Sequence, residues 1–460
     1  MALELLGLLV VDGAFLLVGA AALVAAGWLT GDAATWARAG VAFPLGLVIV
    51  IVPASYLALV RVPVSWTASL VGLLVIAAAV VGVSRRGWSF SLPARVRARP
   101  TTGTAAAAGV ALILAVLLAY SARTFAIRPL VEWDAWAVWT AKARLLYVEP
   151  SLAPQALRSG NYGQTPYPLG LPTLEALGFS AMGRYDPTLI GVQFILLAIS
   201  FPIALWALLR NRARSWIIAL AALVVVGAPQ VLYQLLTHYA DVPLGLFVGL
   251  GLAAGAAWLV SERPEGWMLA CFAAFLGMAG LTKSEGLLFS LAGAAALGVA
   301  TVLTRERARR LPAAAAIGAM LAVVLPWRLY CAVYGLSTPD YDLAHIGDYA
   351  YLRAHTDRVG PVVHELLRQL AATDKWGLLA LVIPLMLIAG LAGARWRLLT
   401  FAGVWLVLSA AGLLLTYWVS TLPLESNLTN TSYRTIVSLL IGGAALVPLF
   451  VFPRGGGERG

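Results

Sequence analysis

The sequence predicts an all-α integral membrane protein, a polytopic bundle of about thirteen transmembrane helices. Of its 460 residues, 61% are hydrophobic and only 12% are charged, and the mean hydropathy is +0.87. This composition is far from that of a soluble globular domain. Apolar runs long enough to cross a bilayer recur along the chain. They fall at about 5–28, 40–60, 65–83, 105–125, 187–209, 215–234, 242–260, 267–282, 286–303, 312–331, 377–393, 398–416 and 434–452.

Clusters of arginine between these runs predict the orientation. Lys and Arg are retained on the cytoplasmic side of a membrane, so the clusters place the N-terminus outside and the C-terminus inside. The net charge of +11 then indicates topology and contact with anionic inner-leaflet lipid, and argues against nucleic-acid binding. The strong excess of Arg over Lys is typical of a GC-rich bacterial genome, so we expect a bacterial plasma membrane protein. The clusters are Arg85, Arg86, Arg95, Arg97 and Arg99; Arg210, Arg212 and Arg214; Arg305, Arg307, Arg309 and Arg310; and Arg395 with Arg397.

The runs divide the chain into three predicted regions. Residues 1–104 form accessory helices with few intramembrane polar residues, followed by a basic linker. Residues 105–334 form a catalytic membrane core whose outer loop, 126–186, is too long to be a simple connector. Residues 335–460 add a second outer loop, 335–376, and the C-terminal transmembrane helices.

The first outer loop opens with two acids among tryptophans, Glu132-Trp133-Asp134, at the predicted membrane edge. Tryptophans mark that edge and carboxylates are costly there, so acids at this level suggest a functional site. The prolines after residue 165 predict a re-entrant or juxtamembrane segment at 168–183. Before it, we expect a juxtamembrane amphipathic helix with one stripe and two off-stripe cations. The stripe is Trp136, Trp139, Ala143 and Leu146, and the cations are Lys142 and Arg144.

Three further polar elements are predicted at the same outer level. Asp241 follows the sixth helix, close to His238. Lys283 and Glu285 lie in the turn after the eighth helix, and Arg434 begins the last helix after a third outer loop at 417–433. We therefore expect an outer-facing pocket that contains Asp134, Asp241, Lys283 and Arg434.

Such a set suits glycosyl transfer from a polyprenyl-phosphate sugar. The acceptor loses a proton as it attacks the anomeric carbon, so a carboxylate can act as general base. The departing lipid phosphate gathers negative charge, which cations stabilise. One base without a covalent intermediate predicts a single displacement with inversion.

The order of these pieces resembles the GT-C membrane glycosyltransferases, in particular bacterial relatives of the protein O-mannosyltransferases and of the aminoarabinose transferase (glycosyltransferase family 39-like). The resemblance covers about 105–452. It implies a GT-C-like fold in which Asp134 is the catalytic base and Lys283 and Arg434 lie near the lipid phosphate. It rests on Glu132 and Asp134, Tyr167-Pro168-Leu169, Tyr239-Ala240-Asp241, the segment from Gly280 to Gly286, Leu325-Pro326-Trp327, and Tyr433-Arg434.

The predicted site has two groups of residues. The catalytic group is Asp134, with Glu132 in support, and Asp241. The substrate-binding group is Lys283, Glu285, Arg434, His238, Trp136, Tyr167 and Lys142. The expected partners are the lipid bilayer, a polyprenyl-phosphate-linked sugar, and a glycan, lipid or protein acceptor. No cofactor is expected, and the histidines His345, His355 and His364 fit no common metal-ligand spacing.

Structural roles are the alternatives for each of these residues. Asp134 and Asp241 would then cap helices, Lys283 and Glu285 would be a local ion pair, Arg434 would anchor at the interface, and the tryptophans would form an aromatic belt. A secondary transporter and an O-antigen ligase or polymerase are the alternative functions. A transporter places its site near the membrane midplane and often has internal repeats, whereas the acids here lie in outer loops.

Overall fold

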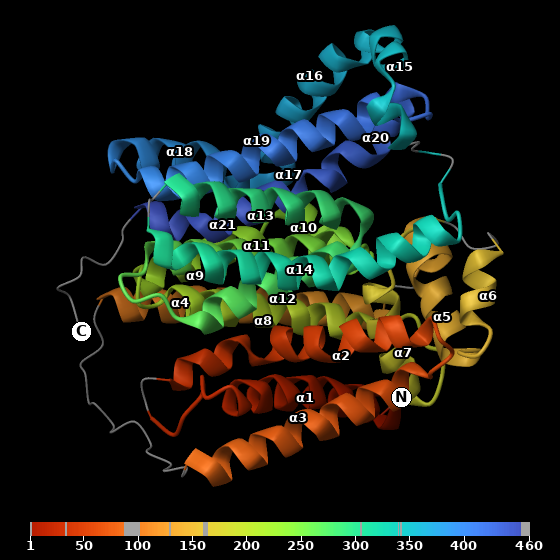
Figure 1. Cartoon of the computed structure of the whole chain (residues 1–460), viewed down its shortest axis with the longest axis vertical. Helices are drawn as coiled ribbons and strands as arrows, with labels where there is room; N and C mark the ends of the chain where they lie inside the picture. The colour runs from red at the N-terminus through yellow and green to blue at the C-terminus, as the bar shows by residue number, and fades with distance from the viewer. Residues whose placement is uncertain are drawn as a thin grey trace.

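A computed structural model describes residues 2–32, 35–86, 102–127, 130–159, 164–303, 306–338, 340 and 343–451. These residues form helices and connecting segments and no β-strand, which confirms the all-α class. The long helices lie roughly parallel to one another, stacked in layers from α1 and α3 to α18 and α19 (Figure 1).

The helices follow the predicted regions. The first region contains α1 (Ala2–Ala25), η1 (Trp36–Val41), α2 (Ala42–Ala58) and α3 (Val64–Arg86). The second contains α4 (Thr102–Ile127), η2 (Asp134–Trp139), α5 (Thr140–Val148), α6 (Ala153–Arg158), α7 (Gly170–Met182), α8 (Gly191–Leu209), α9 (Ser215–Val226), α10 (Pro229–Leu236), α11 (Asp241–Val260), α12 (Gly266–Thr282), α13 (Ser284–Leu303) and α14 (Arg307–Val333). The third contains η3 (Leu343–Gly347), α15 (Tyr349–Ala354), η4 (Thr356–Arg358), α16 (Val359–Leu370), α17 (Thr373–Trp376), η5 (Gly377–Leu381), α18 (Val382–Ala392), α19 (Trp396–Trp418), α20 (Leu424–Thr435) and α21 (Val437–Val451).

Ten helical segments of the described chain are long and apolar enough to cross a membrane, so the chain is a multi-pass membrane protein. The other three predicted runs form different structures. Helices α9 and α10 are bent by 60° at a break before Pro229, and count as an eleventh span only if taken together. Helices α4 and α12 contribute shorter apolar stretches. The count of thirteen therefore remains a prediction.

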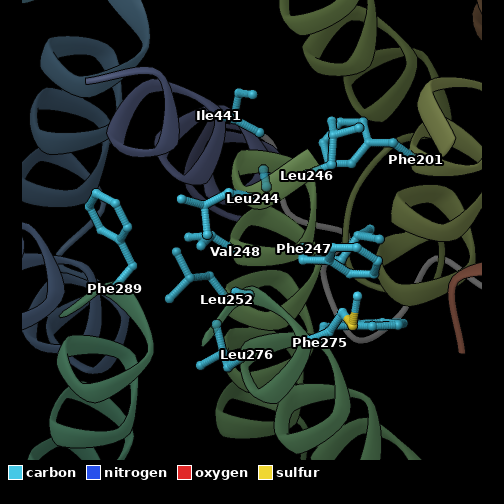
Figure 2. Close-up of a cluster of buried hydrophobic side chains, with 14 of the residues drawn as sticks. Phe201, Leu244, Leu246, Phe247, Val248, Leu252, Phe275, Leu276, Phe289 and Ile441 are labelled. Atoms are coloured by element: carbon cyan, nitrogen blue, oxygen red, sulfur yellow. The ribbon is translucent and has the colours of Figure 1, made fainter. Parts of the chain in front are cut away.

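Helix α11 forms the centre of the bundle, and the apolar stretch that marks it as a span is entirely buried. Its side chains meet those of α8, α12, α13 and α21 in one hydrophobic cluster (Figure 2). Phe247 of α11 lies 6.3 Å from Phe275 of α12 between ring centroids. Since α11 is surrounded, its first residue, Asp241, is held in a fixed position.

The first region packs directly against the rest of the bundle. Gly19 of α1 and Gly46 of α2 permit close backbone contact, because a Cβ atom at Gly19 would lie 1.8 Å from the Ala42 carbonyl oxygen. The Ser55 hydroxyl of α2 lies 2.9 Å from Thr173 Oγ1 of α7. The 13 residues of α7 are too few to span a bilayer, in agreement with the predicted re-entrant or juxtamembrane segment.

The described arginines of the predicted clusters meet at one end of the bundle, here called the basic end. Arg212 donates to Ser261 Oγ, which joins the α8–α9 and α11–α12 loops. Arg397 pairs with Glu306 at 2.7 Å, and Arg395 donates to the Leu449 carbonyl oxygen near the end of α21. Arg95, Arg97, Arg99 and Arg305 lie outside the described residues.

The opposite end carries α5, α6, α7, α15, α16 and α20 (Figure 1). The sequence predicted a loop at 417–433, but most of it is helix α20, in which Leu428 packs toward the core. Arg434 consequently lies in the last turn of α20 rather than at the start of the final helix. Residues 160–163 of the proline-rich segment lie outside the described residues.

Candidate active site

Five charged side chains at the end opposite the basic end form a continuous series of ion pairs. Lys283 Nζ lies 2.7 Å from Asp241 Oδ1 and 2.9 Å from Glu285 Oε1. Arg434 donates from Nε and Nη2 to Asp241 Oδ2, at 3.2 and 3.1 Å. The same Nη2 atom contacts Asp134 Oδ2. The charges therefore alternate in sign from Glu285 to Asp134, and we call these five residues the ion-pair series.

Each member of the ion-pair series occupies a position that the fold fixes. Asp241 is the first residue of α11, and Lys283 separates α12 from α13. The turn at Lys283 is tight because a Cβ atom at Gly286 would lie 1.9 Å from the Ala279 carbonyl oxygen. Asp134 begins the π-helical turn η2, and such turns are rare and frequent at functional sites.

Burial differs sharply along the series. The Asp241 side chain is 2% exposed and the Lys283 side chain 5%. Arg434 is 10% exposed and Asp134 is 24% exposed, the largest fraction in the series. Asp241 is thus enclosed between two cations, whereas Asp134 has one cationic partner and an accessible face.

The carboxylates stabilise the buried ammonium. Burial alone would lower the pKa of Lys283, but Asp241 and Glu285 outweigh burial and raise this pKa above its ordinary value. Lys283 therefore remains a cation at neutral pH.

Aromatic side chains cover the Arg434 end of the series. The Arg434 guanidinium lies 4.1 Å from the centroid of the Tyr239 ring. Burial raises the pKa of the Tyr239 hydroxyl above its ordinary value, Arg434 opposes this rise, and Asp134 and Glu132 add to it. Glu132 accepts a hydrogen bond from the Tyr233 hydroxyl at 3.3 Å. Glu132 therefore lies beside the site but outside the ion-pair series.

Lys142 differs from its predicted place on the polar face of an interfacial helix. Its side chain is fully buried, and its Nζ atom donates to the carbonyl oxygens of Gln164, at 2.6 Å, and Tyr167, at 3.1 Å. Burial lowers its pKa to about 7. Trp136, predicted in the apolar stripe, is 50% exposed. The π-helical turn η2 explains both differences, because its wider turn rotates the helix that follows.

Tyr167 is held close to the series by the proline-rich segment. Its ring stacks on Trp139 at 5.3 Å between centroids, and it contributes to the raised pKa of Lys283. Trp327 Nε1 donates to the Pro166 carbonyl oxygen at 2.9 Å. His238 is buried and stacks on Phe194 at 4.9 Å, a contact directed to α8 rather than to the ion-pair series.

The second outer loop covers the same end. Glu365 of α16 accepts a hydrogen bond from the Ser432 hydroxyl of α20 at 3.0 Å. Arg368, hydrogen-bonded to Glu365 at 2.7 Å, lowers the Glu365 pKa to about 2. Gln164 donates to Asp340 Oδ2, so both outer loops contact each other.

Two buried ionisable residues near this end were missed by the sequence interpretation. Arg328 of α14 donates to the Ser284 carbonyl oxygen at 3.2 Å, between Lys283 and Glu285. Its buried Nε atom has no hydrogen-bond partner among the described residues. Glu175 of α7 is fully buried, and burial raises its pKa to about 8 while Thr140 opposes the rise. An ionisable residue within each apolar run was the available signal.

Within the described part of the chain, no group of three His, Cys, Asp or Glu side chains is arranged to hold a metal ion. No protein-family model, curated protein or solved structure matches this chain.

Proposed function

We propose that the chain is a membrane glycosyltransferase that transfers a sugar from a polyprenyl-phosphate donor to an acceptor on the extracytoplasmic face of a bacterial plasma membrane. The observation that carries the proposal is the position of Asp134, the accessible end of an otherwise buried ion-pair series. The series lies opposite the basic end, which the positive-inside rule assigns to the cytoplasm.

In the proposed reaction, Asp134 is the general base. The acceptor hydroxyl or amine attacks the anomeric carbon and transfers its proton to Asp134 as the new bond forms. The bond between the anomeric carbon and the phosphate oxygen breaks, and the polyprenyl phosphate leaves with the electron pair. Because one displacement occurs, the anomeric configuration inverts.

Asp241 has a different proposed role from Asp134. Both of its oxygens accept hydrogen bonds from cations, so it has little capacity to accept a substrate proton. It is better placed to hold Lys283 and Arg434 in position as a positioning residue. Glu132, hydrogen-bonded to Tyr233, would support the segment that carries Asp134.

The proposed phosphate contacts are Arg434 and Arg328. Arg434 reaches the accessible end of the series through Asp134, and Arg328 has a buried Nε atom available for an additional acceptor. Guanidinium groups suit phosphate oxygens because they present several donors in one plane. Lys283 would act at longer range, since two carboxylates already bind it.

A transfer assay in nanodiscs with a radiolabelled polyprenyl-phosphate sugar tests this function. We expect Asp134→Asn to reduce turnover roughly a hundredfold or more, and the matched substitution Glu425→Gln, at an exposed acid of α20, to leave turnover unchanged. Nuclear magnetic resonance of the product should show an inverted anomeric centre. Full turnover by the Asp134 variant, or a retained configuration, would reject the proposed mechanism.

A secondary transporter is a second candidate, favoured by the break between α9 and α10. Broken helices line substrate sites in several transporter folds, and these two are bent by 60°. Ion-gradient-driven uptake of a labelled sugar into liposomes, without formation of a glycoside, would favour transport over transfer.

A further inference from the structure

The largest cavity described here lies at the basic end, far along the bundle from the ion-pair series. Its volume is about 770 Å³, within the range of small-molecule sites. It opens between the α8–α9 loop, the α11–α12 loop and the start of α19, next to the last turn of α21. Four helix ends therefore shape one concave site.

The charge of this cavity is strongly positive. Its walls carry four arginines, Arg212, Arg263, Arg395 and Arg397, and one acid, Glu262. Arg397 pairs with Glu306. For the other three arginines, no ion pair with a carboxylate of the described chain occurs, so the cavity holds an excess of cations.

Two of these arginines are half-buried and bound only to neutral groups. Arg212 donates to Ser261 Oγ and to the Leu208 carbonyl oxygen, at 3.0 and 3.4 Å, and Arg395 donates to the Leu449 carbonyl oxygen. Burial lowers the pKa of both guanidinium groups, but an arginine remains charged at neutral pH. Removing such charges from water without a counter-charge is costly, and a bound anion would offset that cost.

The remaining walls indicate the kind of anion. Leu398, Leu449 and Val260 give the cavity apolar surface, and Trp396 stands at its rim with 64% of its surface exposed. Tryptophan is enriched at the level of lipid headgroups. A ligand that combines a phosphate with an apolar body matches these walls better than a free, fully hydrated anion does.

We infer that this cavity binds the phosphodiester headgroup of an anionic phospholipid. Arg212 and Arg395 would contact the phosphate oxygens, and Trp396 and Leu398 would contact the glycerol and upper acyl chain. Basic recesses between transmembrane helices are known to recognise such headgroups. The inference does not depend on the proposed glycosyl transfer, because the two sites lie at opposite ends of the bundle.

Native mass spectrometry of the delipidated full chain tests the inference with phosphatidylglycerol and phosphatidylcholine as probes. We expect the wild type to bind phosphatidylglycerol preferentially, and Arg212→Gln/Arg395→Gln to weaken this binding about tenfold or more, since each charge-assisted hydrogen bond contributes about 1.5–3 kcal/mol. The matched control is Arg61→Gln/Arg158→Gln, which removes two arginines from the smaller cavity between α2 and α6 and should bind as the wild type does.

Three results would overturn the inference: equal binding of the two lipids, equal loss in both double variants, or displacement of phosphatidylglycerol by millimolar inorganic phosphate, which would identify a site for a soluble anion. If the double variant does not fold, the single variant Arg395→Gln provides the same comparison. Asp134→Asn should bind phosphatidylglycerol normally, so failure of the transfer hypothesis would leave this measurement unaffected.

Discussion

Asp241 and Lys283 form a buried ion pair, 2.7 Å between Oδ1 and Nζ, that joins the first residue of α11 to the turn between α12 and α13. Arg434 of α20 binds the other oxygen of the same carboxylate. One acid therefore ties three segments of the bundle together, and it does so with a side chain that is only 2% exposed.

We predict that Asp241→Asn strongly destabilises the protein. The substitution leaves Lys283 and Arg434 without their shared counter-charge in a buried site, which typically costs about 3–5 kcal/mol. Asp134→Asn should cost less, because Asp134 is partly exposed and exposed pairs contribute roughly 0–1 kcal/mol. Thermal unfolding in detergent measures both variants, and an equal fall in the melting temperature would contradict the difference in burial.

The convergence of these charges was predictable, but their pairing was not. Alternation of transmembrane helices fixes the side of the membrane at which each helix ends, so Asp241, Lys283 and Arg434 had to share one end. Which carboxylate each cation binds depends on helix rotation and packing, which the apolar pattern does not encode. Lys142 illustrates the limit: its off-stripe position predicted exposure, yet the π-helical turn before it directs the side chain into the protein.

Burial of Lys142 predicts a distinctive pH dependence. Its pKa is about 7 in the folded protein and near 10.4 in the unfolded chain. Between these values the unfolded state binds one more proton, so the free energy of unfolding should rise with pH by up to about 1.4 kcal/mol per unit. Lys142→Met should lose this rise over pH 7 to 9.5, although it also loses hydrogen bonds to two or more carbonyl groups. An unchanged slope in chemical denaturation would place the titration elsewhere.

Glu175 predicts the opposite slope in a lower window. Its pKa is about 8 in the folded protein against a model value of 4.5, so between these values the folded state holds the extra proton. Stability from this residue is therefore complete below pH 4.5 and is lost as pH rises to 8. Glu175→Gln, which imitates the protonated acid, should flatten the slope and raise the melting temperature at pH 8. No gain at pH 8 would contradict a neutral Glu175.

Close packing of α1 against α2 predicts a sensitive glycine. A Cβ atom at Gly46 would lie 1.7 Å from the Phe15 carbonyl oxygen, whereas at Gly13 of α1 a Cβ atom would meet nothing within 4 Å. Gly46→Ala should therefore force the helices apart and cost about 1–3 kcal/mol. Gly13→Ala should be neutral or slightly stabilising, since alanine favours a helix. Thermal unfolding of the two variants compares the same change in composition, and similar melting temperatures would contradict the close contact.

Arg328 provides a test of donor binding that is independent of the base. If its free Nε atom contacts the donor phosphate, Arg328→Gln should raise KM for the polyprenyl-phosphate sugar about tenfold or more, because a hydrogen bond to a charged group contributes about 1.5–3 kcal/mol. The melting temperature should change little, since no carboxylate loses its partner. Arg158→Gln is the matched control: Arg158 contacts the same helix through Tyr330 but is exposed, so KM should not change. A fall in kcat without a change in KM would instead assign Arg328 to the transition state, and unchanged kinetics would remove it from the site.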